Sequence, residues 1–442
     1  MTDDADRLYP NRGGPPDDSP SGTDGGSGVS RRGLLAGSAT AGAALAAGCS
    51  SDSTDDDGGA YGPATDDRTG DGTRSEDTVF VFNTEDATVS IIDPVADEVV
   101  DTQHVGLSSS FPSNQYTPEL TTDSEDPLWL NVNRGVRAIT AGSLSEVANV
   151  DTGSGSNWQE LTPEGDSLVV SAREPAHTNY RIDADRGSET FGEVTAELDR
   201  TDEGGRGDND GPGPCDVTVH PDGAFAYVPD LYGDTLTVLD VEAFEIETQV
   251  EVPPVGNDDA ASPWMGTVAP NGDRLVVEHR TGTESIWDTS DPADPELLAQ
   301  LTPDDGLGEG ALTSEVGPDS ATGYVFTPGT NDVSVVDIEA REVAERISLD
   351  GAAFVGTWDP NRERLYVPVQ TNDEVAVIDH AAREVVERIS VGSAPYGVTA
   401  ARVRPKSDQS ASILAAMAAV GLDVGEADTT YCIGNCACGH EL

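Results

Sequence analysis

Two stretches of the chain, which begin at Tyr324 and Tyr366, have nearly the same sequence 42 positions apart. The first reads YVFTPGTNDVSVVDIEAREVAERISLD and the second reads YVPVQTNDEVAVIDHAAREVVERISVG. Apolar residues alternate with polar ones inside each copy, which is the period of a β-strand. A repeat of about 40 residues indicates a row of small β units. One unit cannot bury its own apolar faces, so the copies must pack against each other.

The unit has a constant internal order, seen most clearly between Cys215 and Val252. An inner strand is followed by a Pro-Asp-Gly turn, a second strand, a third strand and a fourth strand. The end of the third strand recurs seven times, at Asp93, Thr140, Asp183, Asp240, Asp288, Asp337 and Asp379. Seven units of four antiparallel strands predict an all-β fold, the seven-bladed β-propeller.

The two ends of the repeat region complement each other. The first copy starts directly at its second strand, Thr78–Phe82, whereas a lone inner strand, Ala394–Ala400, follows the seventh copy. An open ring would leave an unpaired strand edge. We therefore expect the C-terminal strand to pair into the first blade and to close a propeller over residues 78–404.

The units resemble the YVTN-type repeats of surface-layer and periplasmic seven-bladed propellers. Tyr227–Asp230 (YVPD) and Tyr366–Val369 (YVPV) occupy the signature position. The resemblance covers about residues 78–404 and implies the fold. It says little about function, because propellers of this kind include both enzymes and passive scaffolds.

The chain is strongly acidic, with 82 Asp and Glu residues against 24 Lys and Arg residues and a formal charge of -58. Such a field repels nucleic acids and anionic lipid surfaces, so neither is an expected partner. In molar salt the Debye length shrinks to about 3 Å, which screens the repulsion among surface carboxylates. An acidic surface with a single lysine, Lys406, resembles the proteins of salt-loving archaea.

The first 77 residues read as an export signal and a tether. Arg31 and Arg32 precede a short apolar run that ends at Gly48, and Cys49 follows. This order resembles a twin-arginine signal with a lipobox, which implies cleavage after residue 48 and lipidation of Cys49. Residues 49–77 are acidic and predict a flexible linker. We expect an extracytoplasmic protein on the outer face of the cell membrane, in contact with the membrane through its lipid anchor only; the alternative is a tail with an incidental free cysteine.

One mouth of the propeller channel carries candidate binding residues. The inner strands begin with an aromatic residue or with Cys215, and two histidines, His177 and His279, follow second strands on the same side. The other members of the set are Trp264, Met265, Phe354 and Tyr396. Aromatic side chains here could stack on a ligand or partner segment, or they could plug the channel as packing. His220 and His380 lie in turns, where we expect them to be exposed.

The C-terminal segment 405–442 contains a linker, a short helix over Ser412–Val420 and a thiol-rich end. The candidate metal ligands at this end are Cys432, Cys436, Cys438 and His440. Thiolate and imidazole ligands suit copper or zinc. The spacing of Cys432, Cys436 and His440 is similar to that of the binuclear copper loop of nitrous oxide reductase and haem–copper oxidases. The alternative is a disulfide in an oxidising exterior, with one cysteine left free.

The sequence shows no adjacent Ser–His or carboxylate arrangement that would create a nucleophile. We therefore predict a monomeric, non-enzymatic binding scaffold that takes a protein or a small-molecule ligand at a channel mouth. The alternative is a copper- or haem-linked oxidoreductase that resembles the propellers of nitrite reductase and nitrous oxide reductase.

Overall fold

The computed structural model describes residues 76–113, 117–156, 158–256 and 258–425. All of them belong to one compact unit, the propeller with its C-terminal extension. Some predictions lie outside the described residues, namely the export signal at Arg31 and Arg32, the lipidation site Cys49 and the tail ligands Cys432, Cys436, Cys438 and His440.

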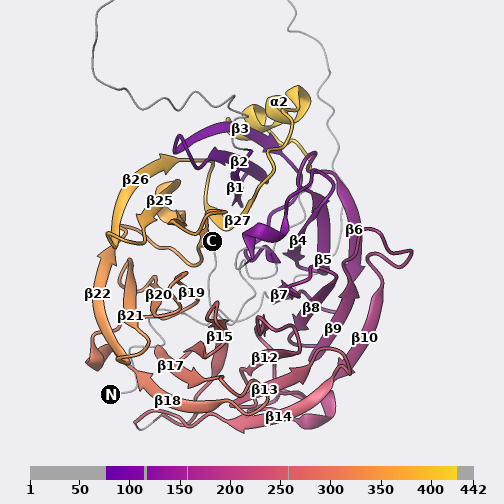
Figure 1. Cartoon of the computed structure of the whole chain (residues 1–442). Helices are drawn as coiled ribbons and strands as arrows, with labels where there is room; N and C mark the ends of the chain where they lie inside the picture. Colours follow the sequence, from indigo (N-terminus) through magenta and orange to yellow (C-terminus); the bar gives the residue numbers. More distant parts are fainter. Residues whose placement is uncertain (1–75, 114–116, 157, 257, 426–442) are drawn as a thin grey trace, which may run out of the picture. The chain divides into compact units, whose positions relative to one another are not determined.

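Seven antiparallel sheets stand around a central channel, so the predicted seven-bladed propeller is confirmed (Figure 1). Blade 1 contains β27 (Pro395–Ala401), β1 (Thr78–Asn83), β2 (Thr88–Asp93) and β3 (Glu98–His104). Blade 2 contains β4 (Pro127–Val132), β5 (Gly135–Thr140) and β6 (Glu146–Asp151). Blade 3 contains β7 (Trp158–Leu161), β8 (Ser167–Ala172), β9 (Thr178–Asp183) and β10 (Val194–Asp199).

The remaining four blades follow in chain order. Blade 4 contains β11 (Thr218–Val219), β12 (Phe225–Asp230), β13 (Thr235–Asp240) and β14 (Glu245–Glu251). Blade 5 contains β15 (Pro263–Val268), β16 (Arg274–His279), β17 (Thr283–Asp288) and β18 (Glu296–Leu301). Blade 6 contains β19 (Ser314–Val316), β20 (Thr322–Thr327), β21 (Asp332–Asp337) and β22 (Glu342–Ser348). Blade 7 contains β23 (Thr357–Trp358), β24 (Arg364–Val369), β25 (Glu374–Asp379) and β26 (Glu384–Ser390).

The ring closes as expected. Strand β27 pairs antiparallel with β1, and Thr78 lies opposite Ala401 in the register of the two strands. The last strand of the propeller thus supplies the inner strand that blade 1 lacks, and the edge of β1 is covered.

Blade 2 differs from the others because its sheet has three strands among the described residues. A loop segment lies beside β4, the innermost of these three strands: the Ser109 hydroxyl donates to Asn131 Oδ1 over 2.7 Å, and the Phe111 amide donates to the same oxygen over 2.9 Å. The Phe111 ring then lies between Trp158 of blade 3 and Tyr396 of blade 1, with centroid distances of 4.2 and 5.8 Å. The loop therefore occupies the space between the inner strands of blades 1 and 3.

The core consists of layers between neighbouring blades, because alternate residues of each strand face opposite ways. In β1, Val79 and Val81 belong to one buried cluster, whereas Phe80 and Phe82 belong to another. The outer strands alternate between exposed and half-buried residues, as in β14, with its sequence EIETQVE.

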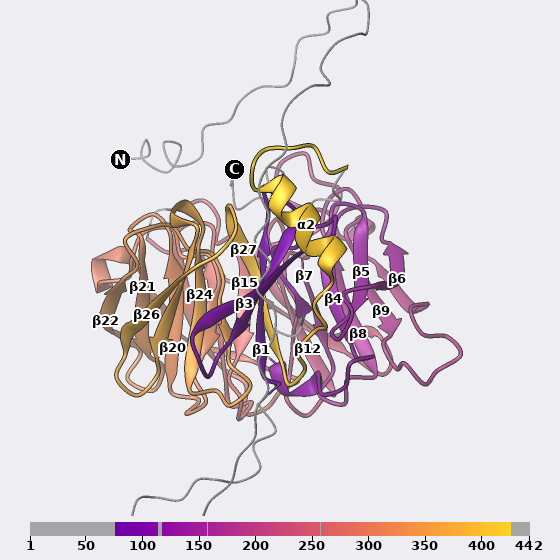
Figure 2. The ribbon, with the colours of Figure 1, turned by 90° about the horizontal axis from the view of Figure 1, so that it is seen from above.

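The helix α2 (Gln409–Ala418) lies against β3, on the outside of blade 1 (Figure 2). The side chain of Asp408 caps its first turn by accepting the amides of Ser410 and Ala411. Short 3-10 helices connect other strands: η2 (Pro118–Leu120), η3 (Thr201–Glu203), η4 (Pro303–Asp305) and η5 (Gln370–Asn372). Within the described ranges, no helix has the length and apolar character needed to cross a membrane.

Candidate active site

The residues predicted at the aromatic mouth are packed against one another. Cys215, Trp264, Met265, Phe354 and Tyr396 are all buried in a single hydrophobic cluster. The rings of Phe354 and Tyr396 stack, with their centroids 5.1 Å apart and their planes 14° apart. These side chains therefore fill the channel where the inner strands begin, and ligand binding by them stays a prediction.

The predicted histidines have separate structural partners. His279 is buried, its Nε2 lies 2.8 Å from the Ser285 hydroxyl, and burial lowers its pKa to about 4. His177 accepts the amide of Gly213 at Nδ1 over 3.2 Å, and burial lowers its pKa. In the part of the chain that the structure describes, no three His, Cys, Asp or Glu side chains gather as a metal site.

The expectation that His220 and His380 are exposed is wrong. His220 is buried, and its Nε2 lies 3.2 Å from the carbonyl oxygen of Gly272 in the next blade. The Nδ1 atom of His380 lies 2.8 Å from the hydroxyl of Tyr324. Both rings extend from a turn to a neighbouring blade, and the sequence of a single repeat does not predict contacts between blades.

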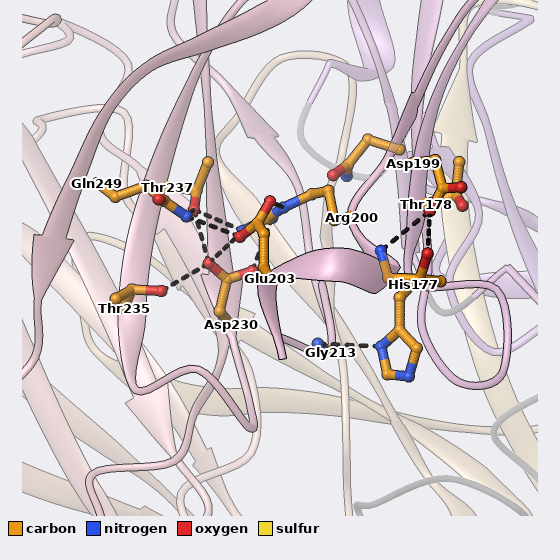
Figure 3. A network of polar contacts seen from close by, with 12 residues as sticks. His177, Thr178, Asp199, Arg200, Glu203, Gly213, Asp230, Thr235, Thr237 and Gln249 are labelled. Atoms are coloured by element: carbon orange, nitrogen blue, oxygen red, sulfur yellow. Dashed lines mark hydrogen bonds and ion pairs between the residues drawn. The ribbon is translucent and has the colours of Figure 1, made fainter. Parts of the chain in front are cut away.

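The acidic insertion after blade 3 is anchored by a buried ion-pair network (Figure 3). The guanidinium of Arg200 donates to both carboxylate oxygens of Asp230 over 2.8 and 2.9 Å and to both oxygens of Glu203 over the same distances. Burial opposes the ionisation of Glu203, but the hydrogen bonds and the charge of Arg200, together with a hydrogen bond from Gln249, outweigh it and lower the pKa of that carboxyl. Every charged group of the network is paired, which indicates a structural role.

A cavity of about 380 Å³ lies at the other end of the channel, where the inner strands end and turn into the second strands. The prolines of three of these turns and valines of the inner strands form its apolar wall. Its polar lining consists of Thr117, Glu119, Glu160, Thr267, Glu315 and Arg362. We call it the acid cavity, because two of its carboxyl groups are buried.

The first of these carboxyl groups belongs to Glu160 on β7. The side chain is 3% exposed, and its Oε2 accepts the amide of Val219 in blade 4 over 2.9 Å. In the same way, the Asp216 carboxyl group accepts the amide of Gly266 in blade 5 over 2.6 Å. A buried carboxyl group that accepts an amide of the next inner strand therefore has a structural role in this propeller. Glu160 differs from Asp216 in that it also lines the acid cavity. Burial raises the pKa of Glu160 to about 8, so its carboxyl is neutral at pH 7.

The second carboxyl group belongs to Glu315 on β19. The residue is 1% exposed, and its Oε1 has no hydrogen-bond partner among the described residues. Burial raises its pKa well above 4.5, the charge of Arg362 acts against this rise, and Glu160 adds to it. Glu160 and Glu315 therefore interact electrostatically although they belong to blades 3 and 6.

Arg362 occupies a turn position with a positive φ angle, where any side chain costs conformational free energy. In the five equivalent turns the amide of this position donates to the carbonyl three residues earlier, over 2.8–2.9 Å. The residue has a positive φ in each turn, and it is Gly in three of them, Ser320 in one and Arg362 (φ 57°) in the last. An L-residue in this conformation costs about 1 kcal/mol relative to glycine. Arg362 Nη2 lies 3.1 and 3.3 Å from the two carboxylate oxygens of Glu119 on η2.

This arrangement can perform acid–base chemistry on a small molecule. A neutral carboxyl can donate a proton, an ionised one can accept a proton from water, and a guanidinium can stabilise negative charge. Sequence reasoning missed Glu160, Glu315 and Arg362, which come from blades 3, 6 and 7. Two signals were present: a glutamate inside each of two short inner strands, and an arginine in place of the turn glycine.

No family model and no curated protein matches the sequence. The fold is similar to the solved structure of the periplasmic gluconolactonase of Pseudomonas aeruginosa, with 16% identity, a TM-score of 0.58 and coverage of 74% of this chain and 99% of that chain. It is also similar to a protein named "putative 6-phosphogluconolactonase" from Bacteroides fragilis, with 13% identity, a TM-score of 0.58 and the same coverages. A third similar structure, from Bacteroides uniformis, has the same name, 14% identity and a TM-score of 0.56, again with these coverages.

At this level of identity the likeness establishes the fold. The names nevertheless contradict the prediction of a non-enzymatic scaffold, because they are names of lactone-hydrolysing enzymes. That prediction depended on the lack of a convergent catalytic set in the sequence. The ring brings Glu160, Glu315 and Arg362 to one cavity from distant positions, so local spacing could not reveal the set.

Proposed function

We propose that the protein is a hydrolase that opens a small lactone, a cyclic ester, in the acid cavity. The observation that carries this proposal is the convergence of two buried carboxyl groups and one guanidinium on a single small-molecule cavity. Displaced carboxyl pKa values in a cavity are typical of acid–base sites. The names of the similar solved structures support the same reaction class.

The two carboxyl groups have different environments, which suits them to different roles. Burial raises the pKa of Glu315, and the charge of Arg362 opposes this rise and favours the ionised form, in which Glu315 accepts a proton from the attacking water. The water oxygen forms a bond to the lactone carbonyl carbon, and the ring C–O bond then breaks. Glu160 is neutral at pH 7 and donates its proton to the departing ring oxygen. The products are a carboxylic acid and a hydroxyl group on one open chain, and one water molecule is consumed.

The test is a pH-stat assay of glucono-δ-lactone and δ-valerolactone hydrolysis, at low and at multimolar salt, with the spontaneous rate subtracted. We expect Glu160→Gln and Glu315→Gln each to lower kcat by a factor of about 100 or more. Asp216→Asn is the matched control, because Asp216 is an equally buried amide acceptor that does not line the cavity. Hydrolysis no faster than the spontaneous rate, or full activity in both glutamine variants, would overturn the proposal.

We also propose that the enzyme acts outside the cytoplasm of a salt-loving archaeon, after twin-arginine export and lipidation at Cys49. The Arg31-Arg32 pair, the apolar run and the acidic composition support this proposal. It predicts that Cys49→Ala releases the protein from the membrane fraction, and unchanged membrane association of this variant would contradict it.

A further inference from the structure

We infer that the substrate carries an anionic group, a carboxylate or a phosphate, that Arg362 binds, and that Glu119 occupies this anion site in the present structure. The inference depends on the proposed function, because it names the substrate class of that same cavity. It concerns binding, however, so it can be measured without turnover.

The backbone at Arg362 gives the first argument. The turn accepts glycine in the equivalent positions of blades 3, 4 and 5, where Gly165, Gly223 and Gly272 have positive φ angles of 71°, 75° and 80°. Arg362 adopts the same conformation at a cost that glycine avoids. Glycine would fit this turn at a lower cost, and the Arg362 side chain lines the cavity and pairs with Glu119, so we place its role there.

The contacts of Arg362 give the second argument. One nitrogen of its guanidinium, Nη2, lies 3.1 and 3.3 Å from the two oxygens of the Glu119 carboxylate. A carboxylate or phosphate of a ligand offers the same kind of charged oxygen acceptor. The side chains of Arg362 and Glu119 are 22% and 45% exposed, so the pair lies at the edge of the cavity. An anionic group of a ligand in the cavity can reach the same guanidinium.

The charge of the cavity gives the third argument. Among the described residues that line it, Arg362 is the one basic side chain. Burial raises the pKa values of Glu160 and Glu315, which lowers the negative charge that these carboxyl groups place beside a bound anion. The described lining therefore provides one positive group for an anion, and Glu119 is a negative group that competes for it.

The position of Glu119 gives the fourth argument. Glu119 belongs to η2, a different segment that lies 243 positions away in the chain, and its contact with Arg362 is made by side chains alone. A partly exposed ion pair contributes only about 0–1 kcal/mol to stability, so a ligand anion can replace Glu119 at little cost. Glu119 thus acts as a built-in competitor whose removal strengthens anion binding.

The test is calorimetric titration of the full chain with 6-phosphogluconate, gluconate and inorganic phosphate. We expect 6-phosphogluconate to bind the wild type, Arg362→Gly to weaken this binding about tenfold or more, and Glu119→Gln to strengthen it. The gluconate and phosphate arms identify which anionic group Arg362 holds. Ser320→Gly is the matched control, because it makes the same backbone change in an equivalent turn that does not line the cavity, and it should leave binding unchanged.

Equal affinities of the wild type and Arg362→Gly for every probe, or no binding of any probe by the wild type, would overturn the inference. Folding of Arg362→Gly is checked by its thermal transition, and glycine suits this turn. The two proposals fail separately. Anion binding that depends on Arg362 without any lactone hydrolysis removes the proposed reaction and keeps the anion site. Hydrolysis that is unaffected by Arg362→Gly, together with unchanged anion affinity, removes the anion site and the role of Arg362 beside Glu315, and keeps hydrolysis by the two glutamates.

Discussion

Glu278 and Glu284 lie directly opposite each other on β16 and β17, and both side chains are fully buried. None of their four carboxylate oxygens has a hydrogen-bond partner among the described residues. Side chains that face each other across antiparallel strands are about 5 Å apart at Cβ, so two buried negative charges here would repel strongly. The pair therefore holds protons in the folded state.

This pair predicts a loss of stability at alkaline pH. Burial raises the pKa of Glu278 to about 8 and that of Glu284 well above 4.5, so the folded state binds more protons than the unfolded state. The stabilising contribution is complete below pH 4.5 and is lost as the pH rises through about 8. We expect a lower Tm at pH 9 than at pH 6, and the Glu278→Gln/Glu284→Gln double variant should reduce this difference. An unchanged difference in the double variant would rule out the pair as its source.

The activity should depend on pH through Glu160. This carboxyl has a pKa of about 8 and donates its proton in the proposed reaction, so kcat should fall as the pH rises through 8. The measurement is the initial rate of lactone hydrolysis from pH 6 to 9, corrected for the spontaneous reaction. In Glu160→Gln the remaining activity should lack this alkaline decline, and a decline of the same shape in the variant would assign it to another group.

Arg362→Gly should keep or slightly raise the stability of the fold while it weakens anion binding. Arg362→Gly removes the cost of an L-residue at positive φ, about 1 kcal/mol, and loses one partly exposed ion pair worth about 0–1 kcal/mol. We expect its free energy of unfolding to be equal to or slightly above that of the wild type, while anion binding is weakened about tenfold or more. Denaturant unfolding checks this, with Ser320→Gly as the reference for the backbone effect. A loss of more than about 2 kcal/mol would show that Arg362 stabilises the ring.

The Arg200–Asp230 pair should contribute far more to stability than the exposed ion pairs. Both side chains are 0% exposed, so Asp230→Asn leaves a buried guanidinium with one fewer charged partner and should cost about 3–5 kcal/mol. The comparison is Arg134→Ala, which breaks an ion pair whose side chains are 77% and 60% exposed and should cost under about 1 kcal/mol. Similar losses in the two variants would contradict the structural role of the network.

The sequence was sufficient for the ring because the repeat and the alternation of apolar residues are local signals. The lone strand after the seventh copy even predicted the pairing of β27 with β1. The loop of Phe111 beside blade 2 was not predictable, since its segment has no repeat equivalent and is placed by contacts with Asn131 and Trp158.

The candidate site could not be predicted from the sequence, for a different reason. Glu160, Glu315 and Arg362 meet only because the ring closes, and nothing in their separate repeats marks them as partners. The aromatic residues that do recur at one strand position, such as Phe354 and Tyr396, are packed on each other in the opposite half of the channel. A regular pattern thus predicted the packing, whereas residues that depart from the pattern carry the candidate chemistry.

The pairing of β27 with β1 also sets the order in which the ring can be completed. Thr78 is made early and its partner Ala401 is made more than three hundred residues later, so β1 keeps an open edge while the other blades are synthesised. Contacts between residues so distant in the chain form slowly, because a large loop must close first. Completion of blade 1 is therefore the last event in building the ring, and a nascent chain that stops before β27 has an unsatisfied strand available for association with other chains.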